Sequence, residues 1–197
     1  MTRYLPVLSD ETTLPSDRLG FIRAYQEAFG GPPYNEQYSD DDVLDHVWHP
    51  HVEDGIVILA IENEKVVGFG CALPVLKAPD EVQRFLSDSE HYTGDLQKTW
   101  YMSELGVINT HRGRGIAYEL VRHRMLTICH RGDMHYAFRT AAMGSNSIHL
   151  YRKIGAQEIP ELQNVGDTDQ VVVNGSESTQ RVYLFGDIAD ALTQLPS

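Results

Sequence analysis

The chain has 197 residues, of which 42% are hydrophobic and 9% aromatic, and its 28 Asp and Glu outnumber its 16 Lys and Arg. The length fits one domain with an ordinary core, and a net charge of −12 excludes a protein that binds nucleic acid through a broad basic face. No apolar run could span a membrane, and the first residues lack the apolar core of a signal peptide. Cys71 and Cys129 are too few for a disulfide scaffold. We therefore expect a soluble, cytoplasmic protein with reduced thiols, folded as a single domain over residues 1–197.

The N-terminal half alternates helical and strand-like patterns. Apolar residues recur at helical spacing from Leu19 to Phe29, and the run of Gly and Pro at 30–33 ends that helix. The continuous apolar run at 56–61 is of strand length, and a polar turn leads into a second strand that pairs with it antiparallel. The elements expected here are a strand at 3–8, a helix ending at 29, a short helix at 43–48, and strands at 56–61 and 66–73.

The C-terminal half begins with a polar, acidic excursion at 77–99 that holds one short helix. Ser145 is the expected N-cap of a later helix, which Gly155 ends. Hairpins at both ends and crossover helices in the middle predict a mixed α/β fold. The expected elements are helices at 82–86, 116–128 and 145–154, strands at 100–108, 136–138, 171–173 and 181–185, and a turn at Asn174-Gly175.

Basic residues concentrate in one window of this acidic chain. Between Lys98 and Lys153 there are nine Lys and Arg against three Asp and Glu. Such a window indicates a local anion site, with a solvated helix face as the equally weighted alternative.

The window contains a strand, a glycine-rich turn and a helix start. Gly113 and Gly115 would let the backbone approach a phosphate, which the unpaired amides and dipole of a helix N-terminus attract. Arg112 and Arg114 could add charge-assisted hydrogen bonds. The turn is not a P-loop, because no Gly-Lys-Ser/Thr follows it. It is not a Rossmann dinucleotide-binding motif either, because Tyr118 stands at the position of that motif's third glycine. The turn therefore predicts a phosphate cradle of another kind, with an ordinary left-handed glycine turn as the alternative.

Two sequence blocks resemble the GNAT superfamily of acyl-CoA-dependent N-acetyltransferases. Residues 112–117 match its Arg/Gln-x-x-Gly-x-Gly/Ala signature after the strand-like segment 104–107, and residues 146–156 are similar to its second block, which carries Asn, Leu-Tyr and Gly. The resemblance implies a GNAT fold, a mixed central sheet with splayed fourth and fifth strands flanked by helices. It covers about residues 3–187, and the 77–99 excursion is longer than the family's usual hairpin.

The resemblance also implies acetyl-CoA as the acyl donor and names the residues that would bind it. Leu105, Gly106 and Val107 would pair with the pantetheine arm through their backbone, and Asn146 would hydrogen-bond that arm. The amides that would hold the pyrophosphate are those of Arg112, Gly113, Arg114, Gly115, Ile116 and Ala117.

Catalytic roles follow from the same blocks. Tyr151 would stand near the sulfur, where its phenol stays protonated at neutral pH and can donate to the departing thiolate, the alternative being a half-buried helix residue. Glu104 is the candidate base for the amine, with a structural salt bridge as its alternative. Strand alternation puts Tyr101 and Ser103 on the opposite face from Glu104. Both cysteines are expected to be structural thiols.

The acceptor region is expected at 29–38, with a contribution from 77–99. Tyr34, Glu36 and Tyr38 combine aromatic and acidic groups, which suit a cationic amine, and a solvated acidic surface is the alternative. His46, His49 and His51 lack metal-ligand spacing, and Pro50 breaks the local helix, so we expect surface histidines and no metal.

The sequence thus predicts an N-acetyltransferase that moves an acetyl group from acetyl-CoA to a primary amine by direct attack. The acceptor is expected to be a cationic small molecule rather than nucleic acid or a membrane. Protein N-terminal or lysine acetylation and a noncatalytic acyl-CoA-binding module are the alternatives, and the resemblance leaves a homodimer open.

Overall fold

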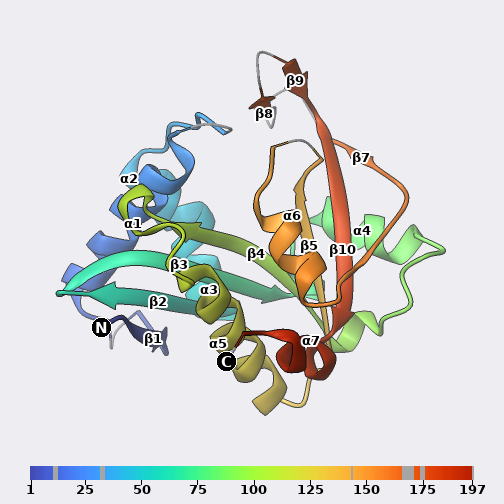
Figure 1. Cartoon of the computed structure of the whole chain (residues 1–197), viewed down its shortest axis with the longest axis horizontal. Coiled ribbons are helices and arrows are strands. Elements are labelled where there is room, and N and C mark those ends of the chain that lie inside the picture. The colour runs from blue at the N-terminus through green and yellow to red at the C-terminus, as the bar shows by residue number, and fades with distance from the viewer. Residues whose placement is uncertain (11–12, 32–33, 143, 166–170, 174–175, 197) are drawn as a thin grey trace.

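A mixed sheet with the strand order β1-β2-β3-β4-β5-β10-β6 forms the centre of the protein (Figure 1). This computed structural model describes residues 1–10, 13–31, 34–142, 144–165, 171–173 and 176–196. The sheet comprises β1 (Arg3–Val7), β2 (Ile56–Glu62), β3 (Lys65–Pro74), β4 (Thr99–Val107), β5 (His135–Ala141), β10 (Gln180–Asp187), β6 (Gln157–Glu158) and β7 (Gln163–Asn164), which pairs with β10. A separate ribbon pairs β8 (Val171–Val173) with β9 (Ser176–Ser178), and the turn predicted between them lies outside the described residues.

The sheet opens between β4 and β5. These strands are parallel neighbours, and their ladder covers only three pairs, from Thr99 with His135 to Tyr101 with Ala137. Both strands continue beyond that point, β4 to Val107 and β5 to Ala141, so they diverge (Figure 1). All other ladders in the sheet are antiparallel. The predicted mixed sheet with splayed fourth and fifth strands is therefore confirmed.

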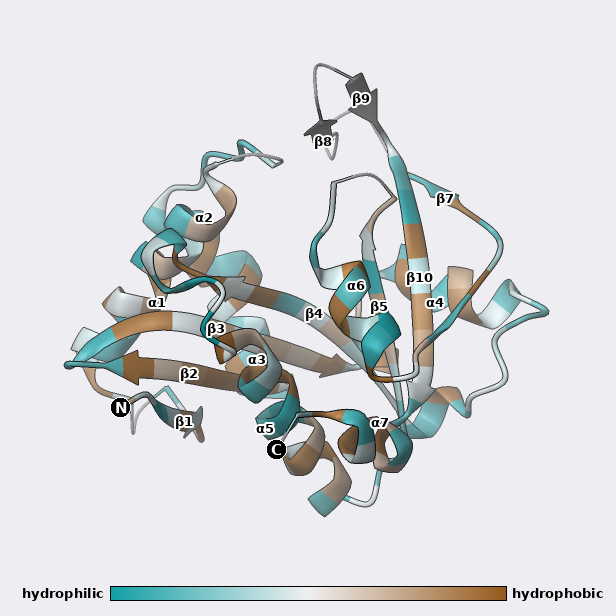
Figure 2. Cartoon of the chain, viewed as in Figure 1, coloured by the Kyte–Doolittle hydropathy of each residue, from teal (hydrophilic) through white to brown (hydrophobic). Residues whose placement is uncertain are grey.

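Helices cover both faces of the sheet, and the apolar strands between them form the core (Figure 2). One face packs against α5 (Ile116–His130), α6 (Ser147–Lys153) and α7 (Ile188–Gln194). The other packs against α1 (Pro15–Phe29), α2 (Asp40–Val43), α3 (His49–Asp54) and, beyond the splay, α4 (Asp80–Asp88). No described helix is both long and apolar enough to cross a membrane.

Two local expectations are wrong. Pro50 does not break the helix, because a π-helical turn at Leu44–Trp48 leads directly into α3 and places Pro50 in its first turn, where a missing N–H costs little. Ser145 is not the N-cap of α6. Asn146 takes that position without a side-chain bond, and Ser145 Oγ instead accepts a hydrogen bond from Thr140 Oγ1 at 2.5 Å.

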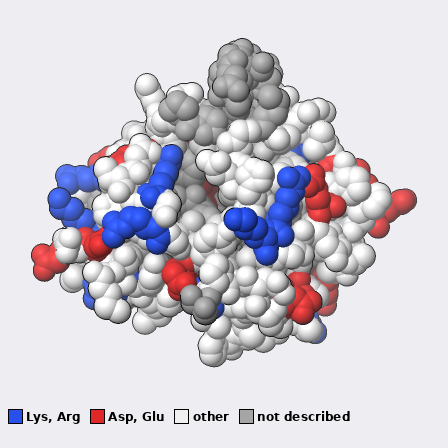
Figure 3. Space-filling view, viewed as in Figure 1, with Lys and Arg blue, Asp and Glu red and all other residues white. Residues whose placement is uncertain are grey.

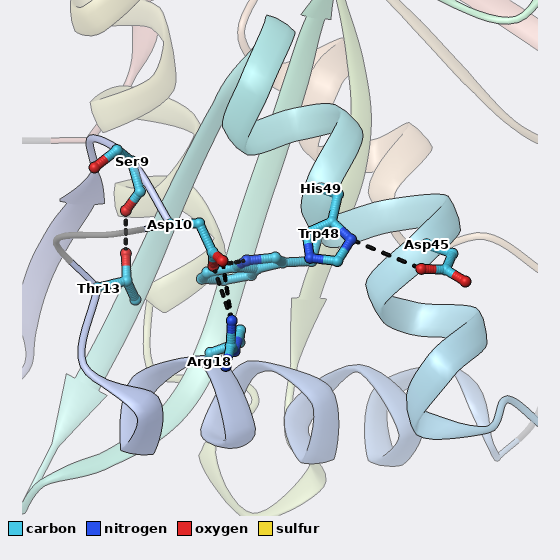
Figure 4. Close-up of polar contacts among 7 residues, drawn as sticks. All are labelled: Ser9, Asp10, Thr13, Arg18, Asp45, Trp48 and His49. Carbon is cyan, nitrogen blue, oxygen red and sulfur yellow. Dashed lines mark hydrogen bonds and ion pairs between the residues drawn. The ribbon is translucent and has the colours of Figure 1, made fainter.

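A small polar cluster fixes the segment after β1 against the first helices (Figure 4). Asp10 accepts hydrogen bonds from the indole Nε1 of Trp48 at 2.8 Å and from Arg18 Nη1 at 3.0 Å. Trp48 is fully buried, so its N–H needs a protein acceptor. Asp10 thereby connects α1, whose C-terminal end lines the site described below, to the π-helical turn.

Replacing Asp10 with Ala should lower the free energy of unfolding by about 1–2 kcal/mol, because it leaves the buried Trp48 N–H without its acceptor. Urea denaturation measures the change. Asp45→Ala is the matched control, since Asp45 is exposed and lies 3.7 Å from His49 in a surface ion pair that contributes little. Equal effects of the two variants would contradict the role given to Asp10.

Candidate active site

The turn between β4 and α5 presents backbone amides to a cavity. Gly113 and Gly115 have φ values of +74° and +80°, a left-handed conformation that a side chain would strain. Gly115 is the N-cap of α5, and no side chain caps that helix. The first-turn amides from Ile116 onward therefore lack intrahelical acceptors and form the positive end of the helix dipole.

These amides open into the larger of two adjoining cavities, here called the cradle cavity, with a volume of about 420 Å³. Its walls come from the open end of β4, the turn, the start of α5, the start of α6 and the end of α1. The predicted donor-site residues that line it are Leu105, Gly106, Val107, Arg112, Gly113, Gly115, Ile116, Ala117 and Asn146. The residues that sequence reasoning missed there include Ala28, Phe29, His111 and Tyr118. Lys and Arg side chains flank a hollow in this face, one group of them over α6 (Figure 3).

The arginine side chains of the turn are already paired with protein groups. Arg114 does not line it and donates to Glu62 Oε1 at 2.9 Å. Arg112 donates through Nε to the Val107 carbonyl at 3.0 Å and through Nη2 to the Ala28 carbonyl at 3.3 Å. The guanidinium groups thus hold the turn to β2, β4 and α1, and the backbone amides remain the groups that could receive an anion.

The second cavity, here called the polar cavity, has a volume of about 220 Å³. It shares Phe29, Tyr34, Leu105 and Ser147 with the cradle cavity, so the two meet where β4 and β5 diverge. The predicted acceptor residues Tyr34, Glu36 and Tyr38 all line it, and Tyr38 donates to Glu36 Oε2 at 2.8 Å. None of its described lining residues comes from 77–99, so the expected contribution of that excursion is not found here.

Glu104 lies in the polar cavity, close to the junction. Tyr25 Oη donates to its Oε2 at 3.4 Å. Burial, with the nearby Glu36 adding to it, raises the pKa of Glu104 from 4.5 to about 7, while Arg139 opposes the shift. A carboxyl group with this pKa can accept a proton near neutral pH.

The expectation that Tyr101 and Ser103 face away from Glu104 is wrong, because all three line the polar cavity. Cys71 on β3 pairs with Glu104 and Leu73 pairs with Tyr101, so two residues separate the β4 partners where β3 has one. This bulge shifts the side-chain alternation and redirects the strand at the site.

Tyr151 is fully buried and lines neither cavity. Its ring stacks on Phe138, with centroids 4.0 Å apart, and Phe138 lines the polar cavity. The phenol oxygen accepts a hydrogen bond from Arg124 Nη2 at 3.2 Å, and burial raises the pKa of Tyr151 above its ordinary value. The hydroxyl therefore stays protonated at neutral pH behind the junction.

Arg124 is a residue of the site that sequence reasoning missed. It is fully buried and donates through Nη1 to the carbonyls of Cys71 at 2.8 Å and Glu104 at 3.0 Å. Gly70 leaves room for it, since a Cβ there would lie 2.8 Å from Arg124 Nε. The signal in the sequence is a charged residue on the apolar face of a helix, beside Leu120, Val121, Met125 and Ile128.

The remaining chemistry-bearing residues lie apart from both cavities. Cys71 is buried and burial raises its thiol pKa well above the ordinary value, whereas Cys129 is exposed. His51 is not a surface histidine as predicted. It is buried, contacts the Val47 carbonyl and Ser103 Oγ at 2.6 Å each, and burial lowers its pKa to about 4. The described residues hold no group of three or more His, Cys, Asp or Glu arranged for a metal ion.

Comparisons with known proteins agree with this geometry. The chain matches the acetyltransferase (GNAT) family model over residues 20–156, which is more than half its length. It therefore belongs to the GNAT acetyltransferase family, and by that membership it is an N-acetyltransferase. A sequence comparison with curated proteins gives no match.

Solved structures share the fold at low sequence identity. An N-acetyltransferase from Staphylococcus aureus Mu50 is similar with a TM-score of 0.65 and 16% identity, over 94% of this chain and 99% of that one. A GNAT acetyltransferase from Elizabethkingia anophelis with acetyl-CoA bound has a TM-score of 0.61 and 15% identity, over 94% and 97%. The ribosomal-protein-S18-alanine N-acetyltransferase of Escherichia coli has a TM-score of 0.63 and 12% identity, over 95% and 94%.

Replacing Arg124 with Met should lower the free energy of unfolding by about 2–4 kcal/mol, because the Cys71 and Glu104 carbonyls lose their donor inside the protein. Thermal and urea denaturation measure the loss. Arg122→Met, on the same helix but in a partly exposed pair with Glu119, should change stability by only about 0.5 kcal/mol. An Arg124→Met variant as stable as the control would show that the buried guanidinium does not hold the site.

Proposed function

We propose that this protein transfers an acetyl group from acetyl-CoA to the primary amine of a small molecule by direct attack. The observation that carries the proposal is the junction of the cradle cavity and the polar cavity at the β4–β5 splay. One cavity offers backbone amides to an anion, and the other offers a carboxyl group to an amine, so the two reactants would meet in the gap between the strands.

The cradle cavity fits the donor on three counts. The first-turn amides of α5 suit the pyrophosphate, and Gly113 and Gly115 keep side chains out of its way. Beyond Tyr101, β4 has no ladder partner on its β5 side among the described residues, which leaves backbone groups of Leu105 and the N–H of Val107 for the amide-bearing arm, while the Val107 carbonyl accepts from Arg112 Nε. Asn146 lines the same cavity from the start of α6. When bound, acetyl-CoA supplies the activated acetyl thioester.

On the acceptor side, the ammonium group first loses one proton to solvent, and the neutral amine attacks the thioester carbonyl. The ionised carboxylate of Glu104 takes the second nitrogen proton as the C–N bond forms and the C–S bond breaks. The departing thiolate takes a proton from Tyr151, which lies one layer behind the junction against Phe138, and the proton held by Glu104 passes back to the phenolate. Holding the amine at the junction supplies most of the rate, because positioning replaces a bimolecular encounter.

Acetylation of a protein N-terminus is the second candidate. It is supported by the likeness to the Escherichia coli enzyme, whose name states that it acetylates an alanine of ribosomal protein S18. The polar cavity is smaller than the roughly 300–1,000 Å³ of sites for drug-sized ligands, which favours a small acceptor.

We further propose that residues 1–197 act as one GNAT domain.

Replacing Glu104 with Gln should lower kcat/KM for acetyl transfer by about 100-fold or more, since the amide cannot accept the amine proton. In the unaltered enzyme kcat/KM should rise with pH through about 7, where Glu104 ionises, and the variant should lack that rise. Free-thiol release measures both. Glu161→Gln, an exposed residue paired with His91, is the control and should behave as the unaltered enzyme.

The raised pKa of Glu104 also predicts that the free energy of unfolding depends on pH, and this effect can be measured without turnover. Its folded-state pKa lies above 4.5, so folding favours the protonated form, and the protein should lose stability as the pH rises from about 4.5 through about 7. The Glu104→Gln variant should lose less over that range. An identical pH dependence in both proteins would contradict the shifted pKa.

Replacing Tyr151 with Phe should lower kcat by about 100-fold or more while acetyl-CoA still binds, because only the proton donor is removed. Stopped-flow thiol release and calorimetry separate the two effects. Tyr136→Phe is the matched control, since Tyr136 is equally buried and its hydroxyl has no hydrogen-bond partner among the described residues. An unchanged rate in Tyr151→Phe would favour a noncatalytic acyl-CoA-binding module or another proton donor.

A further inference from the structure

Two consecutive residues of β4 line the polar cavity, although a regular strand turns neighbouring side chains to opposite faces. In the ladder with β3, the partners of Tyr101 and Glu104 are separated by only one residue, so a bulge falls at 102–103. Ser103 and Glu104 consequently share one cavity. Their Cα atoms are about 3.8 Å apart across the peptide bond, so a single small group in the cavity can contact both side chains.

His51 fixes the orientation of the Ser103 hydroxyl from the α3 side. Its Nδ1 lies 2.6 Å from the Val47 carbonyl, which can only accept, so Nδ1 carries the ring hydrogen. Burial lowers the pKa of His51 to about 4, so the ring is neutral at neutral pH and Nε2 has a free lone pair. Nε2 lies 2.6 Å from Ser103 Oγ. The serine hydroxyl therefore donates its hydrogen to His51.

The Ser103 oxygen is therefore available to the cavity as a hydrogen-bond acceptor. A serine hydroxyl has one hydrogen and two lone pairs, and the hydrogen is held by His51. Ser103 is half-buried at the cavity wall, and the described residues direct no hydrogen-bond donor at its oxygen. A cavity hydroxyl whose orientation is fixed by a buried histidine is pre-organised for an N–H of a ligand.

The acceptor nitrogen of the proposed reaction supplies such an N–H. An ammonium group has three N–H bonds, and acetylation removes two of their protons, one to solvent and one to Glu104. The third N–H stays on the nitrogen and is present in the amide product. It needs an acceptor in a cavity from which the substrate displaces water. Holding it together with the N–H at Glu104 directs the nitrogen lone pair to the thioester.

We propose that Ser103, oriented by His51, accepts a hydrogen bond from the N–H that the acceptor nitrogen keeps throughout the transfer. Ser103 is then a catalytic residue that selects primary amines over their N-methyl counterparts, and His51 is its positioning residue. An N-methyl amine has a methyl group in place of that N–H and leaves the Ser103 oxygen without a donor. The inference rests on the proposed acetyl transfer and names two residues that determine its acceptor specificity.

The test compares matched amines with acetyl-CoA on the unaltered enzyme and on Ser103→Ala, measured by free-thiol release. The pairs are butylamine with N-methylbutylamine, phenethylamine with N-methylphenethylamine, and a peptide that begins with alanine with its N-methylalanine counterpart. In the unaltered enzyme, kcat/KM should be about 10-fold or more higher for the primary amine of a pair. Ser103→Ala should lower kcat/KM for the primary amine about 5- to 10-fold, the effect of one lost hydrogen bond, and leave the N-methyl amine nearly unchanged.

Further variants assign the preference to the oxygen and to its orientation. Ser103→Thr keeps the hydroxyl and should keep the preference for the primary amine. Ser87→Ala, at an exposed serine of α4, is the matched control and should also keep it. His51→Leu should reduce the preference in the unaltered enzyme and add nothing in Ser103→Ala, because His51 acts only through Ser103. The Ser103 variants decide the inference even where His51→Leu fails to fold.

Other outcomes overturn the role of Ser103 and leave acetyl transfer intact. A preference that Ser103→Ala keeps in full, or equal turnover of both amines of every pair by the unaltered enzyme, would do so. A rise for the N-methyl amine without a loss for the primary amine would show that Ser103 acts through its size and not through a hydrogen bond.

Failure of the proposed function gives a different result. Turnover of the peptide pair alone would overturn the small-molecule acceptor, and the ratio within that pair then decides the role of Ser103. If no amine is acetylated, the proposed transfer fails, and thermal protection by the same amines in the presence of CoA decides that role. Stronger protection by the primary amines that is lost in Ser103→Ala would support it, and equal or no protection would overturn it.

Discussion

The functional architecture depends on the early end of the β4–β5 ladder. After three pairs the parallel strands separate, so the backbone of β4 from Met102 to Val107 loses a neighbour on that side while β3 still holds the other. Unpaired backbone groups inside a sheet are unfavourable unless something pairs with them. The gap is therefore both a structural cost and the place where an extended ligand can complete the sheet, and both cavities open onto it.

The opening is stabilised from the opposite face of the sheet. Arg124 reaches across Gly70 and donates to the carbonyls of Cys71 and Glu104, and its other nitrogen holds the Tyr151 hydroxyl. One buried side chain thus connects β3, β4, α5 and α6 at the point of divergence. The same contact sets Glu104, the candidate base, and Tyr151, the candidate acid, on two sides of one guanidinium group.

The parts of the site that local sequence encodes could be predicted, and those that depend on strand pairing could not. The cradle at Arg112–Ala117 is a continuous segment whose glycines and helix start carry their own geometry, and all but Arg114 line the cavity. The hydrogen-bond partners of Arg112 and Arg114 could not be predicted, because the Ala28 carbonyl and Glu62 belong to elements that are distant in the sequence. The bulge in β4 removed the simple alternation on which the orientation of Tyr101 rested. Of the charged residues that line the polar cavity, Glu36 could be predicted because it lies in a local acidic segment. Arg139 and Arg181 could not, because they are distant in the chain and come together only in the folded sheet.

The measurement that tests the central claim most directly is hydrogen–deuterium exchange of the backbone amides with and without saturating acetyl-CoA. If the ligand completes the open edge of β4 and binds the N-terminus of α5, exchange should slow at residues 103–107 and 113–118, with β1 and β2 unchanged as internal references. NAD and ATP at the same concentration should not reproduce that pattern. Protection confined to other segments, or none with folded protein, would contradict the assignment of the splay as the donor site.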